Sequence, residues 1–147
     1  VIFNAAPALP PNKKFFDRVD LLVVNQLEAK MLLSEKTETF ENLTALNRLQ
    51  NLGPKEVIIT LGAEGYIGIS KDGDIFSKPG VKVDVISTHG AGDTFVGTLA
   101  AFISKDKPIS VAAQYAQASS ALHVKTPTDQ REKIQQVDIE NMFLLNQ

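Results

Sequence analysis

The stretch that indicates the fold most clearly is Leu21-Leu22-Val23-Val24-Asn25-Gln26-Leu27-Glu28. Its four apolar residues lie between Asp20 and Asn25, and a short unbroken apolar run is typical of a strand buried on both faces. Asn25 then provides a helix N-cap, and Glu28 follows three residues later, as in a capping box. We therefore predict a buried strand followed directly by a helix that extends to about Leu33.

The same order of strand and helix recurs along the chain. Residues 57–60 predict a second buried strand, and a helix over residues 41–52 precedes it, with Leu43, Leu46 and Leu49 on one side. Asp72-Gly73 is typical of a hairpin turn. The remaining predicted elements are hairpin strands 66–70 and 75–78, strands 1–3 and 81–85, and helices that end near residues 104, 124 and 145. This alternation predicts an α/β fold in which helices flank a mostly parallel sheet, with the hairpin as an insertion.

The composition limits the classes of protein to which the chain can belong. Among its 147 residues, 44% are hydrophobic and 22% are charged, as in an ordinary globular domain. The net charge of -2 offers no basic surface for nucleic acid or for an anionic membrane. The chain has no cysteine and 2 histidines, which argues against a thiolate or histidine-rich metal site. Because we find neither a membrane-spanning apolar run nor a signal peptide, we expect a cytoplasmic protein.

The strongest functional signal is the stretch Thr88-His89-Gly90-Ala91-Gly92-Asp93-Thr94-Phe95. A strand is expected before it and a long helix after it, so its small residues would let the first helical amides approach an anion closely. Asp93 would repel a resting phosphate, but its carboxylate could take a proton from an acceptor hydroxyl while the amides hold the γ-phosphoryl group. That arrangement is what a small-molecule kinase needs. A tight turn in which Asp93 merely favours the helix dipole explains the loop equally well.

A dinucleotide-binding loop is another interpretation of the same glycines. Gly90-x-Gly92 could begin a G-x-G-x-x-G fingerprint, but Phe95 stands where the third glycine belongs. The P-loop pattern is absent from the chain. An oxidoreductase domain is therefore disfavoured, and a nucleotide would be bound by another device.

Two further loops follow predicted buried strands. The capping box alone explains Asn25 and Glu28, but both would also lie beyond the carboxyl end of a strand, where open α/β sheets bind ligands. There Asn25 could contact a phosphate oxygen and Glu28 could hold magnesium through water. Thr60-Leu61-Gly62-Ala63-Glu64-Gly65 is either a plain turn into the hairpin or a loop with room for a flat or phosphate-bearing ligand. Because polar or glycine-rich loops follow three successive strands, we expect them to form one site.

In this order and at this spacing, the three motifs resemble those of the ribokinase family, also called the phosphofructokinase-B carbohydrate kinases. Residues 90–95 are similar to its C-terminal signature, Asn25-x-x-Glu28 to its magnesium and phosphate motif, and Thr60-x-Gly62-x-x-Gly65 to its nucleotide loop. Residues 3–8 also resemble a family stretch, Asn-Pro-Ala-Pro-Ala. The resemblance covers residues 1 to about 125 and implies a three-layer, ribokinase-like fold.

The resemblance implies phosphorylation of a sugar hydroxyl by ATP and Mg²⁺, and the match at residues 4–8 favours a ribose-like sugar. Asp93 would be the catalytic base and would contact the sugar. The amides that would form the anion hole belong to Gly90, Ala91, Gly92 and Asp93. The residues that would bind the nucleotide are Asn25, Thr60, Leu61, Gly62, Ala63, Glu64, Gly65, Gly92, Asp93 and Gln117. Glu28 would hold Mg²⁺ through water.

Two stretches depart from the family's pattern. Ser87-Thr88 stands where the signature usually begins with Asp-Thr, and residues 125–130 stand where the family often has a Gly-Ala loop. The resemblance ties both stretches to an activating monovalent cation, so these departures argue against activation by K⁺. His89 could offer such a site only its carbonyl.

Members of this family are considerably longer than this chain. The resemblance therefore implies that residues 1–147 are the C-terminal, nucleotide-binding and catalytic portion of the fold, without the N-terminal half that provides most sugar contacts and the lid. An exposed sheet edge would then favour a homodimer or pairing with that half. Two functions stay open: a carbohydrate kinase, or an inactive module that binds ATP or a partner, because turnover needs a positioned acceptor and a closed site.

Overall fold

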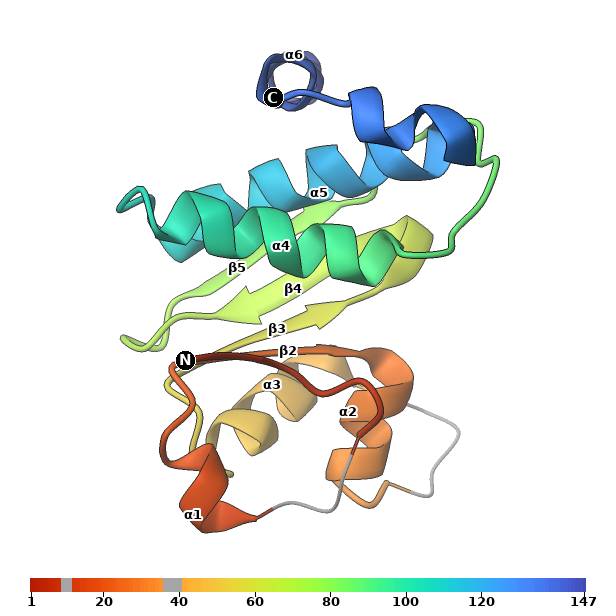
Figure 1. The fold of residues 1–147 in the computed structure, drawn as a ribbon. Helices are drawn as coiled ribbons and strands as arrows, with labels where there is room; N and C mark the ends of the chain where they lie inside the picture. The colour runs from red at the N-terminus through yellow and green to blue at the C-terminus, as the bar shows by residue number, and fades with distance from the viewer. Residues whose placement is uncertain (9–11, 36–40) are drawn as a thin grey trace. The chain divides into compact units, whose positions relative to one another are not determined.

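The computed structural model describes residues 1–8, 12–35 and 41–147. These residues form two compact units, Val1–Pro79 and Gly80–Gln147. The first unit contains a sheet with helices, and the second is helical (Figure 1).

The first unit is built on a five-stranded sheet with the strand order β1-β2-β3-β4-β5. Its strands are β1 (Ile2–Asn4), β2 (Leu21–Asn25), β3 (Glu56–Thr60), β4 (Gly65–Ile69) and β5 (Ile75–Pro79). Strands β1, β2 and β3 are parallel, whereas the pairs β3-β4 and β4-β5 are antiparallel. Within this described sheet, β4 alone therefore runs against the other strands. The mostly parallel α/β sheet and its hairpin insertion are confirmed.

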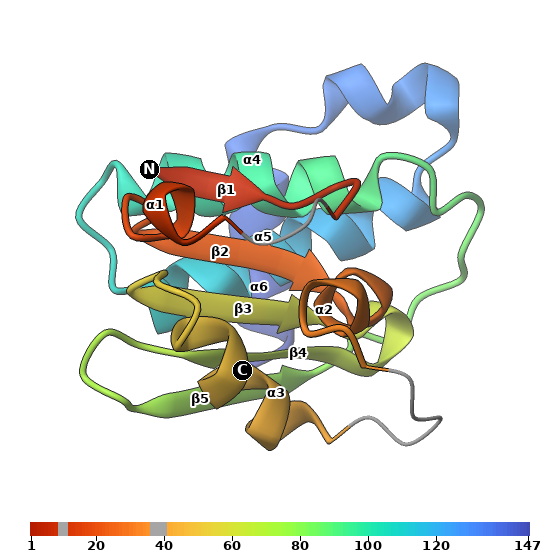
Figure 2. The same ribbon diagram turned by 90° about the horizontal axis from the view of Figure 1, so that it is seen from below.

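Helices α1 (Lys13–Phe16), α2 (Gln26–Leu32) and α3 (Asn42–Gln50) belong to the same unit (Figure 2). Their apolar side chains form a common core with alternate residues of the strands. This core includes Leu22, Val24, Ala29, Leu32, Leu46, Leu49, Val57 and Ile59. Of the three leucines predicted on one side of α3, Leu46 and Leu49 are buried, whereas Leu43 is 47% exposed and Ala45 is buried in its place. The buried stripe therefore runs through positions 45, 46 and 49.

The hairpin turn between β4 and β5 forms at Asp72-Gly73. Gly73 has a φ of +88°, which is the left-handed conformation that glycine adopts without strain. The Ser70 hydroxyl accepts hydrogen bonds from the amides of Asp72 (3.2 Å) and Asp74 (3.1 Å), which holds the tip of the turn. The predicted turn between the two antiparallel strands is thus confirmed.

The second unit consists of α4 (Ala91–Ile103), α5 (Ile109–Lys125), the 3₁₀ segment η2 (Thr128–Lys133) and α6 (Gln136–Leu145). One ring from each α-helix joins a stack: Phe102 lies 4.0 Å from Tyr115, and Tyr115 lies 4.1 Å from Phe143, between ring centroids. The three predicted helices are confirmed, whereas η2 was not predicted. None of the described helices combines the length and the apolar character that a membrane-spanning segment requires.

The predicted strand at residues 81–85 is wrong, because the structure has no strand there. Alternating apolar and polar residues favour an extended chain with one buried side, but Val85 and Ile86 are 56% and 58% exposed. A strand also needs a backbone neighbour, and the sheet ends at β5. The loop that leads to α4 therefore does not follow a strand of the described sheet.

Candidate active site

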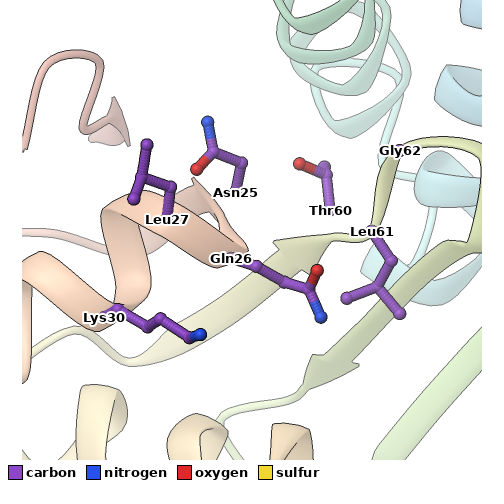
Figure 3. A pocket seen from close by; sticks show the side chains of 7 residues that line it. All are labelled: Asn25, Gln26, Leu27, Lys30, Thr60, Leu61 and Gly62. Carbon is purple, nitrogen blue, oxygen red and sulfur yellow. The ribbon is translucent and has the colours of Figure 1, made fainter. Parts of the chain in front are cut away.

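The carboxyl ends of β2 and β3 lie side by side in the first unit. Asn25 is the last residue of β2 and is paired in parallel register with Thr60, the last residue of β3. Figure 3 shows both polar side chains directed to the same side of this edge. The Thr60 hydroxyl donates a long hydrogen bond of 3.4 Å to the Val24 carbonyl. Asn25 and Thr60 therefore lie close together, as expected.

Asn25 and Glu28 form a reciprocal capping box at the start of α2. The Asn25 side-chain oxygen accepts from the Glu28 amide at 2.9 Å, and the Glu28 carboxylate accepts from the Asn25 amide at 2.8 Å. The stabilising interpretation of this motif is thus confirmed. Within the described residues, the structure gives no partner to the Asn25 side-chain nitrogen, which leaves a donor for a ligand.

The loop between β3 and β4 is a compact turn around the 3₁₀ segment η1 (Gly62–Glu64). The Leu61 amide donates to the Gly65 carbonyl at 2.8 Å and closes the turn. Gly62 and Gly65 have φ values of +59° and +106°, so both positions favour glycine. The backbone at Gly62 is open, because nothing lies within 4 Å of a Cβ built there. Burial raises the pKa of Tyr66, directly after this loop, so its hydroxyl stays protonated near neutral pH.

An open pocket of about 480 Å³ lies between α2 and this turn (Figure 3). Its lining residues are Asn25, Gln26, Leu27, Lys30, Thr60, Leu61 and Gly62. The pocket thus brings together four of the predicted nucleotide-binding residues. The other predicted residues of this unit, Glu28, Ala63, Glu64 and Gly65, do not line it. Gln26 and Lys30 were not predicted to line a site, although their spacing of four residues on one helix face could have indicated them.

The second unit contains the loop and helix start that carry Asp93. Gly90 is the N-cap of α4, has a φ of +78° and has no side chain with which to cap the helix. The Ala91 amide donates to the Thr88 carbonyl at 3.1 Å. Within the described residues, the amides of Gly92 and Asp93 have no acceptor, and the Asp93 side chain is exposed. This end of α4 therefore presents open donors beside a carboxylate.

Side chains of helix α5 form hydrogen bonds with residues at the start of α4. The Ser120 hydroxyl donates to the Ala91 carbonyl at 3.0 Å. His123 bridges two residues, with its Nε2 2.8 Å from the His89 carbonyl and its Nδ1 3.0 Å from the Thr94 hydroxyl. Gln117, predicted to contact the nucleotide, is buried in the same helix with 8% exposure. The contacts of Ser120 and His123 could not be predicted from the sequence, because they depend on the packing of α5 against α4.

The acidic residues of the described chain do not form a ready-made metal centre. Among the residues that the structure describes, no group of three or more His, Asp or Glu side chains could hold a metal ion. Mg²⁺ typically takes one or two protein carboxylates and completes its shell with water and phosphate oxygens. A single carboxylate such as that of Glu28 is therefore compatible with a metal ion that arrives with a nucleotide.

The sequence matches the model of the pfkB family carbohydrate kinases over residues 1–135. A ribokinase of Schizosaccharomyces pombe is 34% identical over 129 residues, which cover 85% of this chain and 41% of the relative. A ribokinase of Lactococcus lactis is 35% identical over 126 residues, which cover 85% of this chain and 39% of the relative. The chain thus spans about two fifths of the length of these curated relatives.

Solved structures show the same relationship. The ribokinase of Thermotoga maritima matches 99% of this chain and 49% of its own, with a TM-score of 0.84 and 31% identity. The ribokinase of Arabidopsis thaliana, solved in complex with ribose and ATP, matches 97% of this chain and 47% of its own, with a TM-score of 0.86 and 25% identity. These matches confirm the predicted ribokinase-like fold. Because the family model covers most of the sequence, the chain belongs to the pfkB family of carbohydrate kinases.

Proposed function

We propose that residues 1–147 are the nucleotide-binding and catalytic portion of a kinase that transfers the γ-phosphoryl group of ATP to a sugar hydroxyl. The observation that carries this proposal is the start of α4, where an exposed Asp93 carboxylate lies beside open amides. A carboxylate at that place would weaken the binding of an anion in its resting state. It is useful where a hydroxyl must lose a proton next to a phosphoryl group.

In the proposed reaction, Asp93 takes the proton of the sugar hydroxyl as the oxygen attacks the γ-phosphorus. The new bond joins the sugar oxygen to the γ-phosphorus, and the bond from that phosphorus to the β,γ-bridging oxygen breaks, so ADP leaves. The amides of Gly90, Ala91, Gly92 and Asp93 stabilise the charge on the transferred group by hydrogen bonds already directed toward it. The Ala91 amide would have to leave the Thr88 carbonyl to take part.

The first unit would contact the nucleotide through the edge formed by β2 and β3. The Asn25 side-chain nitrogen and the Thr60 hydroxyl would donate to phosphate oxygens, while residues 61–65 would lie against the rest of the nucleotide. Lys30 adds positive charge to the same pocket. Glu28 would hold Mg²⁺ through water, and the ion would neutralise phosphate charge. Gln117 is a further proposed nucleotide contact. Because its side chain is buried in α5, the nucleotide would have to approach that helix closely.

The sugar is proposed to be ribose-like, because several relatives are ribokinases and the Arabidopsis structure contains ribose with ATP.

β1 is an edge strand of the described sheet, so its outer backbone groups could pair with a second copy of the chain or with an N-terminal half. The alternative function is binding without turnover. It applies to residues 1–147, which match 41% of the length of a curated relative.

Calorimetric titration of the 147-residue chain with a non-hydrolysable ATP analogue and Mg²⁺ tests the proposal, together with an assay for ribose-dependent ADP formation. We expect nucleotide binding, and we expect Asp93→Asn to keep that binding while lowering kcat by about 10²–10⁴-fold. Nucleotide binding without ADP formation would support the binding module. If the analogue fails to bind at millimolar concentration, the kinase and the ATP-binding module are both wrong for this polypeptide, and only the module that binds a partner is left.

A further inference from the structure

Three backbone carbonyls of the second unit converge on one side chain, that of Arg131. Its Nη2 donates to the Ser87 carbonyl at 2.9 Å, its Nη1 to the His89 carbonyl at 3.0 Å, and its Nε to the Thr126 carbonyl at 3.1 Å. Arg131 lies in η2, beyond the end of α5, and two of these carbonyls belong to the loop that precedes α4 (Figure 1). The guanidinium thus joins that loop to the segment after α5.

The acceptors of Arg131 are all neutral. The structure gives this residue no carboxylate partner among the described residues, so its charge is balanced by carbonyl dipoles. An arginine side chain stays protonated at all ordinary pH values, and its planar fork fixes the directions of its donors. Converging carbonyl oxygens are also the ligands that replace the water shell of K⁺ in proteins. A guanidinium in their midst supplies the positive charge that a bound ion would supply.

The His89 carbonyl is the most important of the three acceptors. It accepts from Arg131 at 3.0 Å and lies 2.8 Å from Nε2 of His123. Because a carbonyl can only accept, Nε2 carries the proton, and Nδ1 is free to accept from the Thr94 hydroxyl at 3.0 Å. The same peptide group ends in the Gly90 amide, a member of the proposed anion hole. Two donors on its oxygen, one of them charged, polarise the peptide and make that amide a stronger donor.

The two departures from the family's sequence pattern coincide with this contact. Ser87, which stands in place of the usual Asp, provides one carbonyl, and Thr126, within the stretch that replaces the Gly-Ala loop, provides another. The two stretches that argue against a K⁺ site are therefore joined by a cation that belongs to the chain itself.

We infer that Arg131 is a positioning residue that acts as a built-in cation: it fixes and polarises the loop before α4, so this chain binds its nucleotide without a monovalent cation. The inference rests on the proposed function, because it assigns the loop to phosphate binding. It predicts that removal of the guanidinium creates a requirement for K⁺ that the natural chain lacks.

The test compares the affinity for a non-hydrolysable ATP analogue with Mg²⁺ in KCl and in choline chloride at equal ionic strength. For the natural chain we expect affinities within twofold in the two salts. For Arg131→Ala we expect at least a tenfold loss in choline chloride and recovery in KCl or in millimolar guanidinium. Arg48→Ala is the matched control, since Arg48 pairs with Glu35 in the first unit and should give the natural result in both salts.

Two outcomes would overturn the inference. One is an affinity of the natural chain that rises tenfold with K⁺, and the other is an Arg131→Ala variant that binds like the natural chain in choline chloride. If Arg131→Ala does not fold, Arg131→Gln keeps a planar donor without the charge and should show the same dependence on K⁺. Full affinity of Arg131→Gln in both salts would mean that the charge of the guanidinium is irrelevant, and the inference would be wrong.

Failure of the proposed function can be separated from failure of this inference by thermal unfolding. If the natural chain binds no nucleotide in either salt, the proposed function fails, but melting temperatures still decide the role of Arg131. We expect the natural chain to melt at the same temperature in KCl and choline chloride, and Arg131→Ala to melt lower and to gain stability specifically from KCl. If the melting temperature of Arg131→Ala does not respond to KCl, the inference that Arg131 acts as a built-in cation is wrong.

Discussion

Helices α2 and α4 begin in opposite ways, although residues at both starts have predicted roles in phosphate binding. At α2, Asn25 and Glu28 satisfy each other's backbone amides through a capping box. At α4, the N-cap is Gly90 in a left-handed conformation, and the amides of Gly92 and Asp93 have no acceptor among the described residues. The first start is closed by its own side chains, whereas the second is left open to a ligand.

The open start of α4 is stabilised by hydrogen bonds from other residues of the second unit. The carbonyls of His89 and Ala91 accept hydrogen bonds from His123, Arg131 and Ser120. All of these contacts lie on the carbonyl side of the loop, so none of them occupies an amide of Gly92 or Asp93. A capped helix start stabilises itself locally, whereas the proposed binding of an anion at α4 needs support that leaves the donors exposed.

The largest expected effect comes from Gly90→Ala. A non-glycine residue in the left-handed region costs about 1–2 kcal/mol. A Cβ at Gly90 would also lie 3.2 Å from Nε2 of His123, which is held in place by the His89 carbonyl. We expect a lower free energy of unfolding and a loss of nucleotide affinity, measured by chemical denaturation and calorimetry.

Gly62→Ala is the matched control for this variant. Gly62 has a φ of +59°, but nothing lies within 4 Å of its Cβ position, so the substitution introduces backbone strain without a new contact. Gly90→Ala should therefore be the more destabilising of the two. Equal losses of stability would mean that the contact with His123 does not constrain the loop.

Asn25→Ala should open the start of α2. Loss of an N-cap side chain costs about 0.5–2 kcal/mol, because the Glu28 amide loses its acceptor. The same substitution at Asn47, which is exposed in the interior of α3, should leave stability nearly unchanged. If both variants unfold at the same denaturant concentration as the natural chain, the capping box makes no measurable contribution.

The two helix starts also show which features of the structure could be predicted from the sequence. Residues 21–28 predicted the strand, the helix and the capping box, because apolar runs and N-caps act through near neighbours. The strand at 81–85 was predicted wrongly, because pairing depends on what lies beside a segment and not on its own alternation. Arg131 and His123 were missed for the same reason: their acceptors at His89 are 42 and 34 residues away.

Gly92→Ala should separate stability from binding at the open start. Nothing lies within 4 Å of a Cβ at Gly92, and replacing glycine by alanine in a compatible conformation stabilises a protein by about 0.4–1 kcal/mol. The added methyl group would lie next to the unpaired amides, so we expect about a tenfold weaker nucleotide affinity, equivalent to about 1.4 kcal/mol. Gly97→Ala, farther along α4 and equally unobstructed, should raise stability without weakening affinity. An unchanged affinity in Gly92→Ala would show that phosphate does not approach this end of the helix.

Glu28→Gln should have the smallest effect on stability, and it separates the two roles assigned to the closed start. A glutamine can still accept from the Asn25 amide, as it does in capping boxes, so only the favourable interaction of the charge with the helix dipole is lost, about 0.3–1 kcal/mol. If Glu28 also holds Mg²⁺ through water, nucleotide affinity in the presence of Mg²⁺ should fall, whereas affinity measured with excess chelator should not change. Equal affinity in Mg²⁺ for the variant and the natural chain would leave Glu28 with its capping role alone, and the proposed phosphate site would then lie at the start of α4 and not at that of α2.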